Sequence, residues 1–318
     1  MEASELLRII INLPIISTGL AEEMLSGNFR SVFRGQGMEF DEARHYQPGD
    51  DIRAIDWNAS ARFGYPFVKN YREERELTIL LLIDVSPSMH RGNISGQEPD
   101  KLKFKPGSKQ SLSPYEQALI SAALIAFSAE HTGLQVGAFF FDKDVEKVFL
   151  PHKGRKHIMS LIMEALQFQN RVKSRRSQYG SNIASALTGA QRLLKKRSLV
   201  VIISDFFSIN WETEMGTLCR KHDCIALRIS GSNEALYPGL ITLEDPETGV
   251  RIEAFAGLHS FKENWESWHN ERTIHWESQC KKCGAAFLDL SIETDAPSTL
   301  MKFFGSRSIG QYRYRNKK

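Results

Sequence analysis

Short apolar runs alternate with longer segments of helical pattern along most of the chain. The uninterrupted apolar runs at residues 78–83 and 199–203 predict strands that are buried on both faces. A strand with one solvent-exposed face would instead alternate apolar with polar residues. Residues 113–116 read Ser-Pro-Tyr-Glu, the spacing of a capping box, and predict a helix that begins there and stops near Gly133. This helix is apolar nearly all round, so we expect it to be largely buried.

The remaining pattern continues the alternation of strands and helices. Further strands are expected at residues 134–141, 145–150, 224–229 and 286–290, helices at 156–168, 182–195, 211–221, 261–279 and 297–304, and a hairpin at 241–255. This order predicts an α/β fold with a doubly wound, mostly parallel sheet, which binds ligands at the carboxyl ends of its strands. We therefore divide the chain into an N-terminal extension (1–75), an α/β domain (76–306) and a basic tail (307–318).

Composition excludes several classes of protein. The 318 residues include 41 Lys and Arg against 38 Asp and Glu, and a net charge of +3 is too near neutral for a general binder of nucleic acid or anionic membrane. Four cysteines do not make a disulfide scaffold in a chain of this length. The apolar runs are shorter than the roughly 18 residues that cross a bilayer, and residues 1–16 lack the basic start of a signal peptide. We expect a cytoplasmic protein with no membrane span.

Oxygen-bearing side chains lie in three of the predicted loops that lead from a strand to a helix. Asp84, Ser86 and Ser88 follow the first buried strand, and in an extended segment these alternate residues project to one side. Ser181 precedes a helix, and Asp205 follows the second buried strand. Hydroxyls, carboxylates and water suit Mg²⁺ or Mn²⁺, and no local His or Cys favours zinc. We expect the three serines to bind the ion directly and the two aspartates to hold its waters.

This pattern resembles the metal-ion-dependent adhesion site of a von Willebrand factor type A domain, over about residues 75–305. The resemblance implies a metal-assisted protein-binding module, in which an acidic residue of the partner completes the metal shell. Two departures are present. Ser181 stands where the family usually has Thr, which keeps the hydroxyl. Residues 204–206 read Ser-Asp-Phe in place of the commoner Thr-Asp-Gly, so the backbone of that loop is expected to differ.

The upstream segment carries a second resemblance. Residues 33–62 read FRGQGMEFDEARHYQPGDDIRAIDWNASAR and are similar to the bacterial domain-of-unknown-function family numbered 58, whose members join this segment to a type A domain. This resemblance implies a link to MoxR-type AAA+ ATPases. We therefore expect a non-enzymatic adaptor or substrate-recruiting partner of such an ATPase, which binds the ATPase or its client.

Two other functions remain open. A phosphatase-like hydrolase would use Asp84 as its nucleophile, but such enzymes usually place a second Asp two residues on, where this chain has Ser86. Nucleic-acid binding through the Lys-rich segment 90–111 and the basic tail is disfavoured by the net charge. We expect the Lys-rich segment instead to lie beside the metal site and to steer an acidic partner toward it.

Three further features have simpler structural interpretations. The acids and arginines at 50–62 are expected to form an ion-pair and capping network that joins the extension to the α/β domain, and catalytic carboxylates or an interaction surface are the alternatives. The four cysteines are expected to be buried free thiols, with a structural zinc site as the alternative. Trp265 and Trp268 lie three apart on one helix face and are expected in the core.

Overall fold

The computed structural model describes residues 3–26, 38–47, 50, 55–73, 77–90, 112–174, 180–231, 240–244, 251–255 and 259–308. The chain divides into two compact units. The larger unit consists of Met1–Arg30 together with Leu77–Lys318, and the smaller consists of Ser31–Glu76. All five residues predicted to form the metal site belong to the larger unit.

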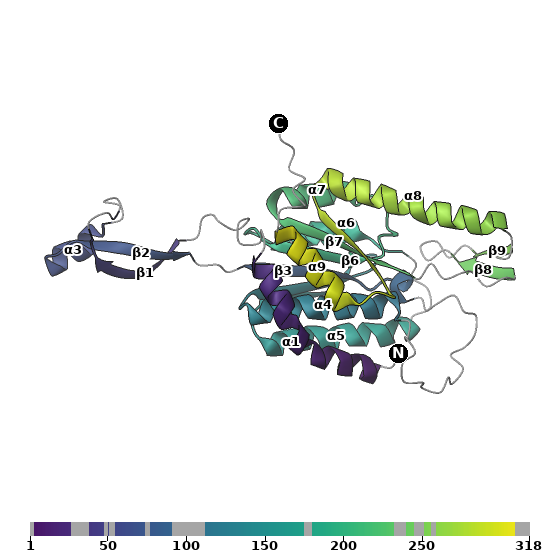
Figure 1. Ribbon diagram of the computed structural model, residues 1–318, viewed down its shortest axis with the longest axis horizontal. Coiled ribbons are helices and arrows are strands. Elements are labelled where there is room, and N and C mark those ends of the chain that lie inside the picture. The colour runs from purple at the N-terminus through teal and green to yellow at the C-terminus, as the bar shows by residue number, and fades with distance from the viewer. Residues whose placement is uncertain are drawn as a thin grey trace. The chain divides into compact units, whose positions relative to one another are not determined.

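A six-stranded sheet forms the centre of the larger unit (Figure 1). Its strands are β3 (Thr78–Asp84), β4 (Gln135–Phe141), β5 (Val145–His152), β6 (Leu199–Ser204), β7 (Asp223–Ser230) and β10 (Ala286–Ser291). Their order across the sheet is β10-β7-β6-β3-β4-β5, and every neighbouring pair is parallel except β4 with β5. The chain winds outward from β3 in both directions, which confirms the predicted doubly wound, mostly parallel α/β fold.

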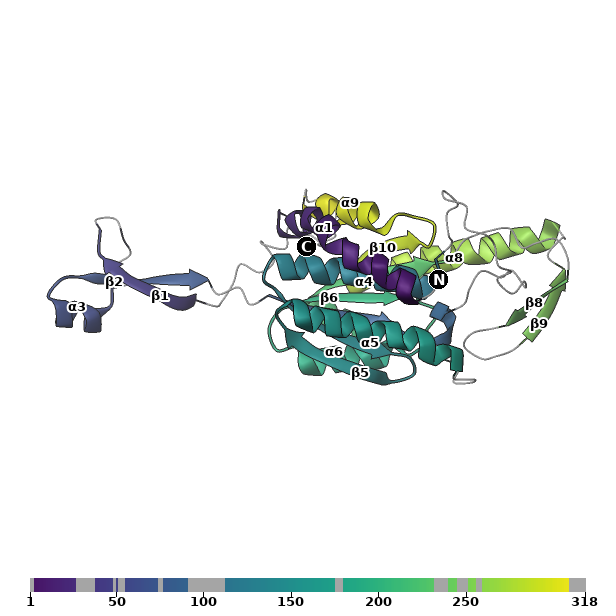
Figure 2. The ribbon, with the colours of Figure 1, turned by 90° about the horizontal axis from the view of Figure 1, so that it is seen from below.

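Helices cover both faces of this sheet (Figures 1 and 2). One face carries α4 (Pro114–His131) and α5 (Arg155–Ser174), and the other carries α6 (Ile183–Leu193), α7 (Glu212–Lys221) and α8 (His259–Cys283). Leu80 and Leu82 of β3 pack in one apolar cluster with residues of α6, α7 and α8. Ile79, Leu81 and Ile83 alternate with them and point to the α4 face, and all five side chains are fully buried. Burial on both faces is the reason that β3 reads as a continuous apolar run.

The predicted capping box begins α4. The Ser113 hydroxyl accepts from the Glu116 amide at 3.2 Å, and the Glu116 carboxylate accepts from the Ser113 amide at 2.8 Å. Every residue from Tyr115 to Ala129 is buried, as the apolar composition of the helix predicted. A helix buried on all sides needs a second layer over its outer face, because one sheet covers only one side.

Helix α1 (Ala3–Ser26) provides that second layer together with α9 (Ala296–Ser308). Its buried residues recur every three or four positions, as in Leu6, Ile10 and Leu13, so that one face packs against α4 and α9. The Ser128 hydroxyl of α4 also donates to a carbonyl of α1 at 3.1 Å. We predicted one extension over residues 1–75, whereas the structure groups residues 1–30 with the α/β unit because this apolar face needs α4 to cover it.

Helix α1 contains Pro14, which removes one backbone hydrogen bond inside the helix. Among the described residues, no single helix is long and apolar enough to span a membrane. The segments Ser4–Ile15 and Ser17–Glu23 reach that length and composition only as a pair, and they are bent by 52° relative to each other.

The smaller unit is an antiparallel hairpin with one short helix. Strands β1 (Met38–His45) and β2 (Phe67–Glu73) pair along their length, and α3 (Trp57–Phe63) lies between them in sequence. Asp56 is the N-cap of α3 and accepts from two backbone amides at 3.0 and 3.2 Å. Arg44 donates two hydrogen bonds to Asp50, at 2.8 and 2.7 Å, and lowers the pKa of that carboxyl. Ion pairing and capping thus occur within this unit, while residues 51–54 lie outside the described part.

The predicted hairpin at 241–255 is confirmed as β8 (Leu240–Glu244) paired antiparallel with β9 (Arg251–Phe255). The predicted steering segment lies outside the described residues from position 91 to position 111. The predicted tail begins inside α9, where Arg307 donates to both carboxylate oxygens of Asp223 at 2.8 and 2.9 Å. Its residues 309–318 lie outside the described part of the chain.

Candidate functional site

The candidate site lies where the winding of the sheet reverses direction. β3 and β6 are parallel neighbours, so their carboxyl ends reach the same edge of the sheet. β3 ends at Asp84, β6 ends at Ser204, and α6 begins just after Ser181. The sequence therefore brings oxygen groups from three separate segments to one place, as predicted.

Asp84 is the centre of this arrangement. Its side chain is fully buried. Oδ1 accepts from the Ser86 amide at 2.9 Å, and Oδ2 accepts from the Ser181 hydroxyl at 2.9 Å and the Ser204 hydroxyl at 2.6 Å. Both carboxylate oxygens are thus held by donors from all three segments, which fixes the position of the charge.

Ser86 and Ser88 lie together, but for a different reason from the one the sequence suggested. We expected an extended segment, whereas Pro87 begins a short 3₁₀ helix, η2 (Pro87–His90). Both serine side chains are buried, and their hydroxyl oxygens are 3.0 Å apart. The tight turn, closed by a bond from the Met89 amide to the Ser86 carbonyl at 3.1 Å, brings the two hydroxyls together beside Asp84.

Asp205 lies next to Asp84 and is 8% exposed. Its Oδ1 accepts from the Phe207 amide at 3.1 Å. Burial first, and the negative charge of Asp205 second, raise the pKa of Asp84 to about 7. The hydrogen bonds from Ser204 and Ser86 act in the opposite direction but do not offset these two effects. Two neighbouring carboxylates in a buried setting would be stabilised by a cation between them.

The loop after Asp205 has a backbone conformation that favours glycine. Phe206 has a φ of 53°, in the left-handed region that costs a non-glycine residue about 1–2 kcal/mol. We expected the backbone to differ from that of the family where Phe replaces the common Gly, and this difference stays a prediction; in this chain Phe206 itself adopts the left-handed conformation. Its ring is 5% exposed and packs 5.4 Å from Trp211 and 5.5 Å from Trp276, measured between ring centroids. This packing holds the loop in place.

Ser204 is a site residue that the sequence analysis missed. Its hydroxyl makes the shortest of the described bonds to Asp84 and also accepts from the Phe206 amide at 3.0 Å. It therefore connects the central carboxylate with the strained loop. Its position could have indicated this role, because Ser204 is the last residue of a strand that is otherwise apolar and buried. A buried hydroxyl needs a hydrogen-bond partner.

The donors present fit a hard divalent cation. They are two carboxylates and the hydroxyls of Ser86, Ser88 and Ser181, all oxygen ligands of the kind that Mg²⁺ and Mn²⁺ prefer. Among the described residues, no three His, Cys, Asp or Glu side chains gather as a metal site would require, so the serines are essential to this donor set. The fit to such an ion rests on the buried, mutually repelling pair Asp84 and Asp205.

The four cysteines are free thiols at the junction of α7, β7 and α8. Cys224 and Cys280 are buried, while Cys219 and Cys283 are half-buried. Burial, first among the causes, raises the pKa of Cys283 to about 11 and raises that of Cys280 as well. Cys280 and Cys283 therefore stay protonated near neutral pH. All four cysteines are free thiols as expected, but only Cys224 and Cys280 are buried as expected.

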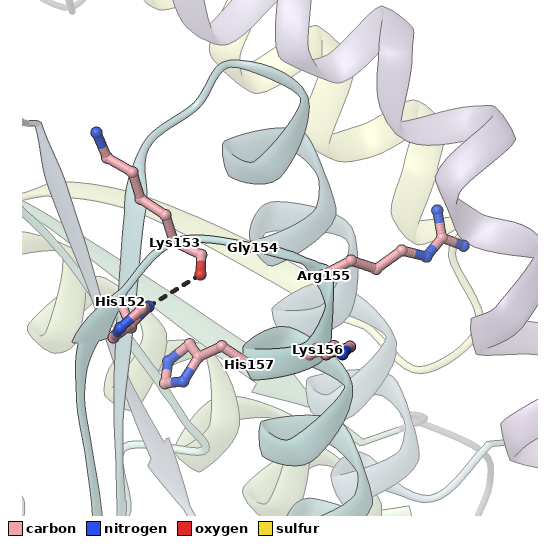
Figure 3. Close-up of a pocket in the computed structure, with 6 residues that line it drawn as sticks. All are labelled: His152, Lys153, Gly154, Arg155, Lys156 and His157. Atoms are coloured by element: carbon pink, nitrogen blue, oxygen red, sulfur yellow. Dashed lines mark hydrogen bonds between the residues drawn. The ribbon is translucent and has the colours of Figure 1, made fainter.

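A pocket of about 520 Å³ lies at the opposite edge of the sheet, where β5 ends and α5 begins (Figure 3). It is lined by His152, Lys153, Gly154, Arg155, Lys156 and His157. Figure 3 shows Lys153 and Arg155 pointing away from each other, and His152 Nδ1 lies 3.0 Å from the Lys153 carbonyl oxygen. Because Lys153 and Arg155 diverge, they do not converge on one ligand, and the oxygen groups around Asp84 remain the candidate site.

Comparison with solved structures gives only distant similarities. An aerotolerance-related membrane protein from Bacteroides fragilis is 14% identical, with 74% of this chain and 99% of that chain covered and a TM-score of 0.42. The SpRpn10 VWA domain is 10% identical, with 70% and 93% covered and a TM-score of 0.37. Both scores are below 0.5, so the fold assignment rests on the strand order described above.

Comparison of sequences identifies the family. An uncharacterized protein of Mycobacterium bovis is 26% identical over 290 residues, which cover 90% of this chain and 85% of that protein. An uncharacterized protein of Mycobacterium tuberculosis matches over the same shares. Residues 42–273 match the profile of the family described as "Protein of unknown function DUF58". Because this match extends over most of the sequence, the chain belongs to the DUF58 family.

Proposed function

We propose that this protein is a metal-ion-dependent protein-binding module. The observation that carries the proposal is the fully buried Asp84, held by three donors and placed beside Asp205, with serine hydroxyls around it. A divalent cation would neutralise this charge pair. Because both carboxylates would hold waters of the ion and not bind it directly, the ion stays electrophilic, and an acidic residue from a partner protein can complete its shell.

The ion we propose is Mg²⁺ or Mn²⁺. The hydroxyls of Ser86, Ser88 and Ser181 would hold it, and Asp84 and Asp205 would position its waters. When bound, the ion supplies a Lewis-acidic position for an external carboxylate. Ser204 then acts as a positioning residue, because its bond to Asp84 keeps that carboxylate oriented toward the serines.

The partner we propose is a MoxR-type AAA+ ATPase or a client protein of that ATPase, in the cytoplasm. This part of the proposal rests on the family resemblance of the segment at 33–62 to proteins linked with such ATPases. Adaptors of this kind need a binding surface rather than a reaction centre. A shell completed by the partner's acid makes the association dependent on the metal, which gives the proposal a direct test.

We also propose that the site binds rather than catalyses. A hydrolase would need an ionised, accessible Asp84, but the side chain is fully buried and both of its oxygens already accept hydrogen bonds. Its raised pKa further lowers the ionised fraction near neutral pH. Measurable turnover of p-nitrophenyl phosphate with Mg²⁺, lost in Asp84→Asn, would instead favour the phosphatase alternative.

Calorimetric titration with Mn²⁺ tests the metal site. We expect weak binding by the wild type and its loss in Asp84→Asn and Asp205→Asn. Asp144→Asn is the matched control, since this exposed residue lies in the β4–β5 turn at the same edge of the sheet. Equal Mn²⁺ binding by all four proteins would refute the site.

Gel filtration with a purified MoxR-type ATPase tests the partner. We expect co-elution in Mn²⁺, separation in EDTA, and separation in Mn²⁺ when Asp84→Asn replaces the wild type. Co-elution that survives both EDTA and the substitution would refute metal-dependent binding to this ATPase.

A further inference from the structure

Exposed cations gather where the chain enters β6 and β7, at the edge of the sheet opposite the metal site. β6 and β7 are parallel neighbours, and the Asp223 amide donates to the Ser198 carbonyl at 2.9 Å, so the ends of α6 and α7 lead into adjacent connections. Five exposed side chains in these two connections form what we call the basic edge: Lys195, Lys196, Arg197, Arg220 and Lys221.

His222 reports the charge between the two connections. Its side chain is buried, and burial first, then Lys221 and Arg197, lower its pKa. Both side-chain charges that act on this histidine are positive, and they come from different connections, so the two cations lie close to the same point. Nδ1 of His222 is buried and has no hydrogen-bond partner among the described residues. An anion bound here would offset a positive charge that surrounds a buried polar group.

Acidic side chains do not neutralise the basic edge within the described part of the chain. The five cations have no ion pair with described residues. Asp223, the nearest acid in sequence, accepts two hydrogen bonds from Arg307 at 2.8 and 2.9 Å. The acids of α7, Glu212 and Glu214, lie in its first turn, about 10 Å or more along the helix from Lys221. Salt screens charges over about this distance.

The next connection along the edge adds to this charge. β10 is the parallel neighbour of β7, and exposed Lys281 and Lys282 lie where the chain enters it. Lys281 lies 3.5 Å from Glu277, whereas Lys282 has no ion pair with the described residues. Positive charge therefore extends across three adjacent strands, about 10 Å at a spacing of about 4.8 Å.

Nucleic acid is a poor fit to this surface. Proteins that bind single strands stack the bases on exposed aromatic rings. In the described part of the larger unit, the exposed large aromatic side chain is Trp268, which lies about 22 Å before the end of α8. Trp268 is 42% exposed and Trp265 is half-buried, so our expectation that both are core residues was wrong.

An anionic membrane is a poor fit as well. Segments that bind a membrane surface insert large apolar side chains into it. Among the described residues of the connections into β6, β7 and β10, no large apolar side chain is exposed. A protein segment that bears carboxylates needs neither stacking nor insertion, and charge complementarity is sufficient for it.

We propose that the basic edge binds an acidic segment of a partner protein, whose carboxylates pair with Arg197 and Lys221. A guanidinium can hold a carboxylate by two parallel hydrogen bonds, and an ammonium acts as a compact point charge. β6 (Leu199–Ser204) separates this surface from the metal site by about 20 Å, at about 3.3 Å per residue. The inference goes beyond the proposed function and does not depend on the metal, because a segment bound here leaves the metal edge open.

A short synthetic peptide of alternating Glu and Ser provides the probe, because alternation places all the carboxylates of an extended peptide on one side. It is titrated into the full-length protein in buffer freed of metal by a chelating resin, and a peptide with Gln in place of Glu is the control. We expect the Glu peptide to bind at low salt, to weaken several-fold at about 0.3 M salt, and the Gln peptide not to bind. Lack of binding by the Glu peptide, or equal binding by both peptides, would overturn the inference.

Nuclear magnetic resonance of His222 places the peptide. We expect the pKa of His222 to rise when the Glu peptide binds, because the carboxylates offset the charges of Lys221 and Arg197. A bound peptide that leaves this pKa unchanged would show that it binds elsewhere, which refutes the basic edge as its site.

Paired variants test the named cations. Arg197→Gln combined with Lys221→Gln should weaken binding of the Glu peptide about fivefold or more, as the loss of two exposed ion pairs would. Circular dichroism should show an unchanged fold, because both side chains are exposed. Arg8→Gln combined with Lys143→Gln is the matched control, since it removes the same charge from exposed residues outside the basic edge. Equal weakening by both pairs would assign the binding to net charge and overturn the inference.

Two further comparisons test the choice of ligand. Tighter binding of a thymidine oligonucleotide of equal charge, or of vesicles that contain phosphatidylglycerol, would refute the assignment to a protein segment. Residues 74–76 read Glu-Arg-Glu, precede β3 and lie outside the described residues. Peptide binding that appears only in Glu74→Gln combined with Glu76→Gln would show that the chain's own acids occupy the basic edge, and would also refute the proposal. Asp84→Asn should bind the peptide as the wild type does, so the metal site and the basic edge are tested separately.

Discussion

Replacing Asp84 by Asn removes the buried charge at the centre of the site and keeps the shape of the side chain. The amide oxygen can still accept from the Ser86 amide in place of Oδ1. The new NH₂ group faces the hydroxyls of Ser181 and Ser204, which can rotate to accept because a hydroxyl both donates and accepts. We therefore expect Asp84→Asn to fold and to lose only the charge.

The magnitude follows from the pKa of Asp84, which is raised from 3.8 to about 7 in the folded, metal-free protein. Between about pH 4 and about pH 7 the folded state keeps a proton that the unfolded chain has lost, so stability falls as pH rises through this window. One pKa unit corresponds to about 1.4 kcal/mol, so the wild type loses about 3 kcal/mol between about pH 5 and about pH 8 through this group. The Asn variant has no such loss.

Urea unfolding followed by far-ultraviolet circular dichroism, in the presence of EDTA, measures this effect. Between about pH 5 and about pH 8, the wild type should lose about 3 kcal/mol of unfolding free energy relative to Asp84→Asn. Saturating Mn²⁺ near neutral pH should stabilise the wild type and leave the variant unchanged. A difference between the two proteins that stays constant with pH would refute the assignment of a charge-destabilised Asp84.

Substitutions at Phe206, at Asp56, and at Ile10 and Ile15 test three separate parts of the structure. Phe206→Gly should be about 1 kcal/mol more stable than Phe206→Ala in urea unfolding, because only glycine adopts the positive φ at this position without strain. The reverse order would exclude backbone strain at Phe206. Asp56→Ala should destabilise α3 by about 1 kcal/mol through loss of its N-cap, seen as faster hydrogen exchange of its first amides and not elsewhere. Ile10 is fully buried, so Ile10→Ala should lower the free energy of unfolding by about 2–5 kcal/mol. Ile15 is 80% exposed on the same helix, so Ile15→Ala should lower it by less than about 0.5 kcal/mol. Equal costs would contradict the packing of α1.

Local patterns in the sequence were sufficient to predict the α/β layers and to place most of the residues of the candidate site. The bare strands at 78–83 and 199–203 and the capping box at Ser113 depend on short-range physical chemistry, and the structure has them where predicted. Asp84 and Ser204 meet because the parallel neighbours β3 and β6 place their carboxyl ends at one edge. The metal and the partner stay predictions.

The remaining features depend on contacts that no local pattern contains. Helix α1 was missed because Pro14 interrupts its pattern and its partners lie far along the chain. The turn at Pro87 replaced the expected extended segment, since a proline after a strand end favours a change of direction. The exposure of Trp268 could not be predicted from spacing, because a stripe on a helix does not tell where the core beneath it ends.

The position of α1 also has a consequence for how the chain folds. α1 ends at residue 26, whereas α4 begins at residue 114 and α9 at residue 296. The layer that covers α4 therefore closes only when segments from opposite ends of the sequence meet, and contacts of such high separation slow folding. Until then the apolar outer face of α4 is open to solvent and to other unfolded chains. A fragment cut to begin at Leu77 would keep the sheet and the metal-site residues but would carry that open face permanently, and we expect it to aggregate.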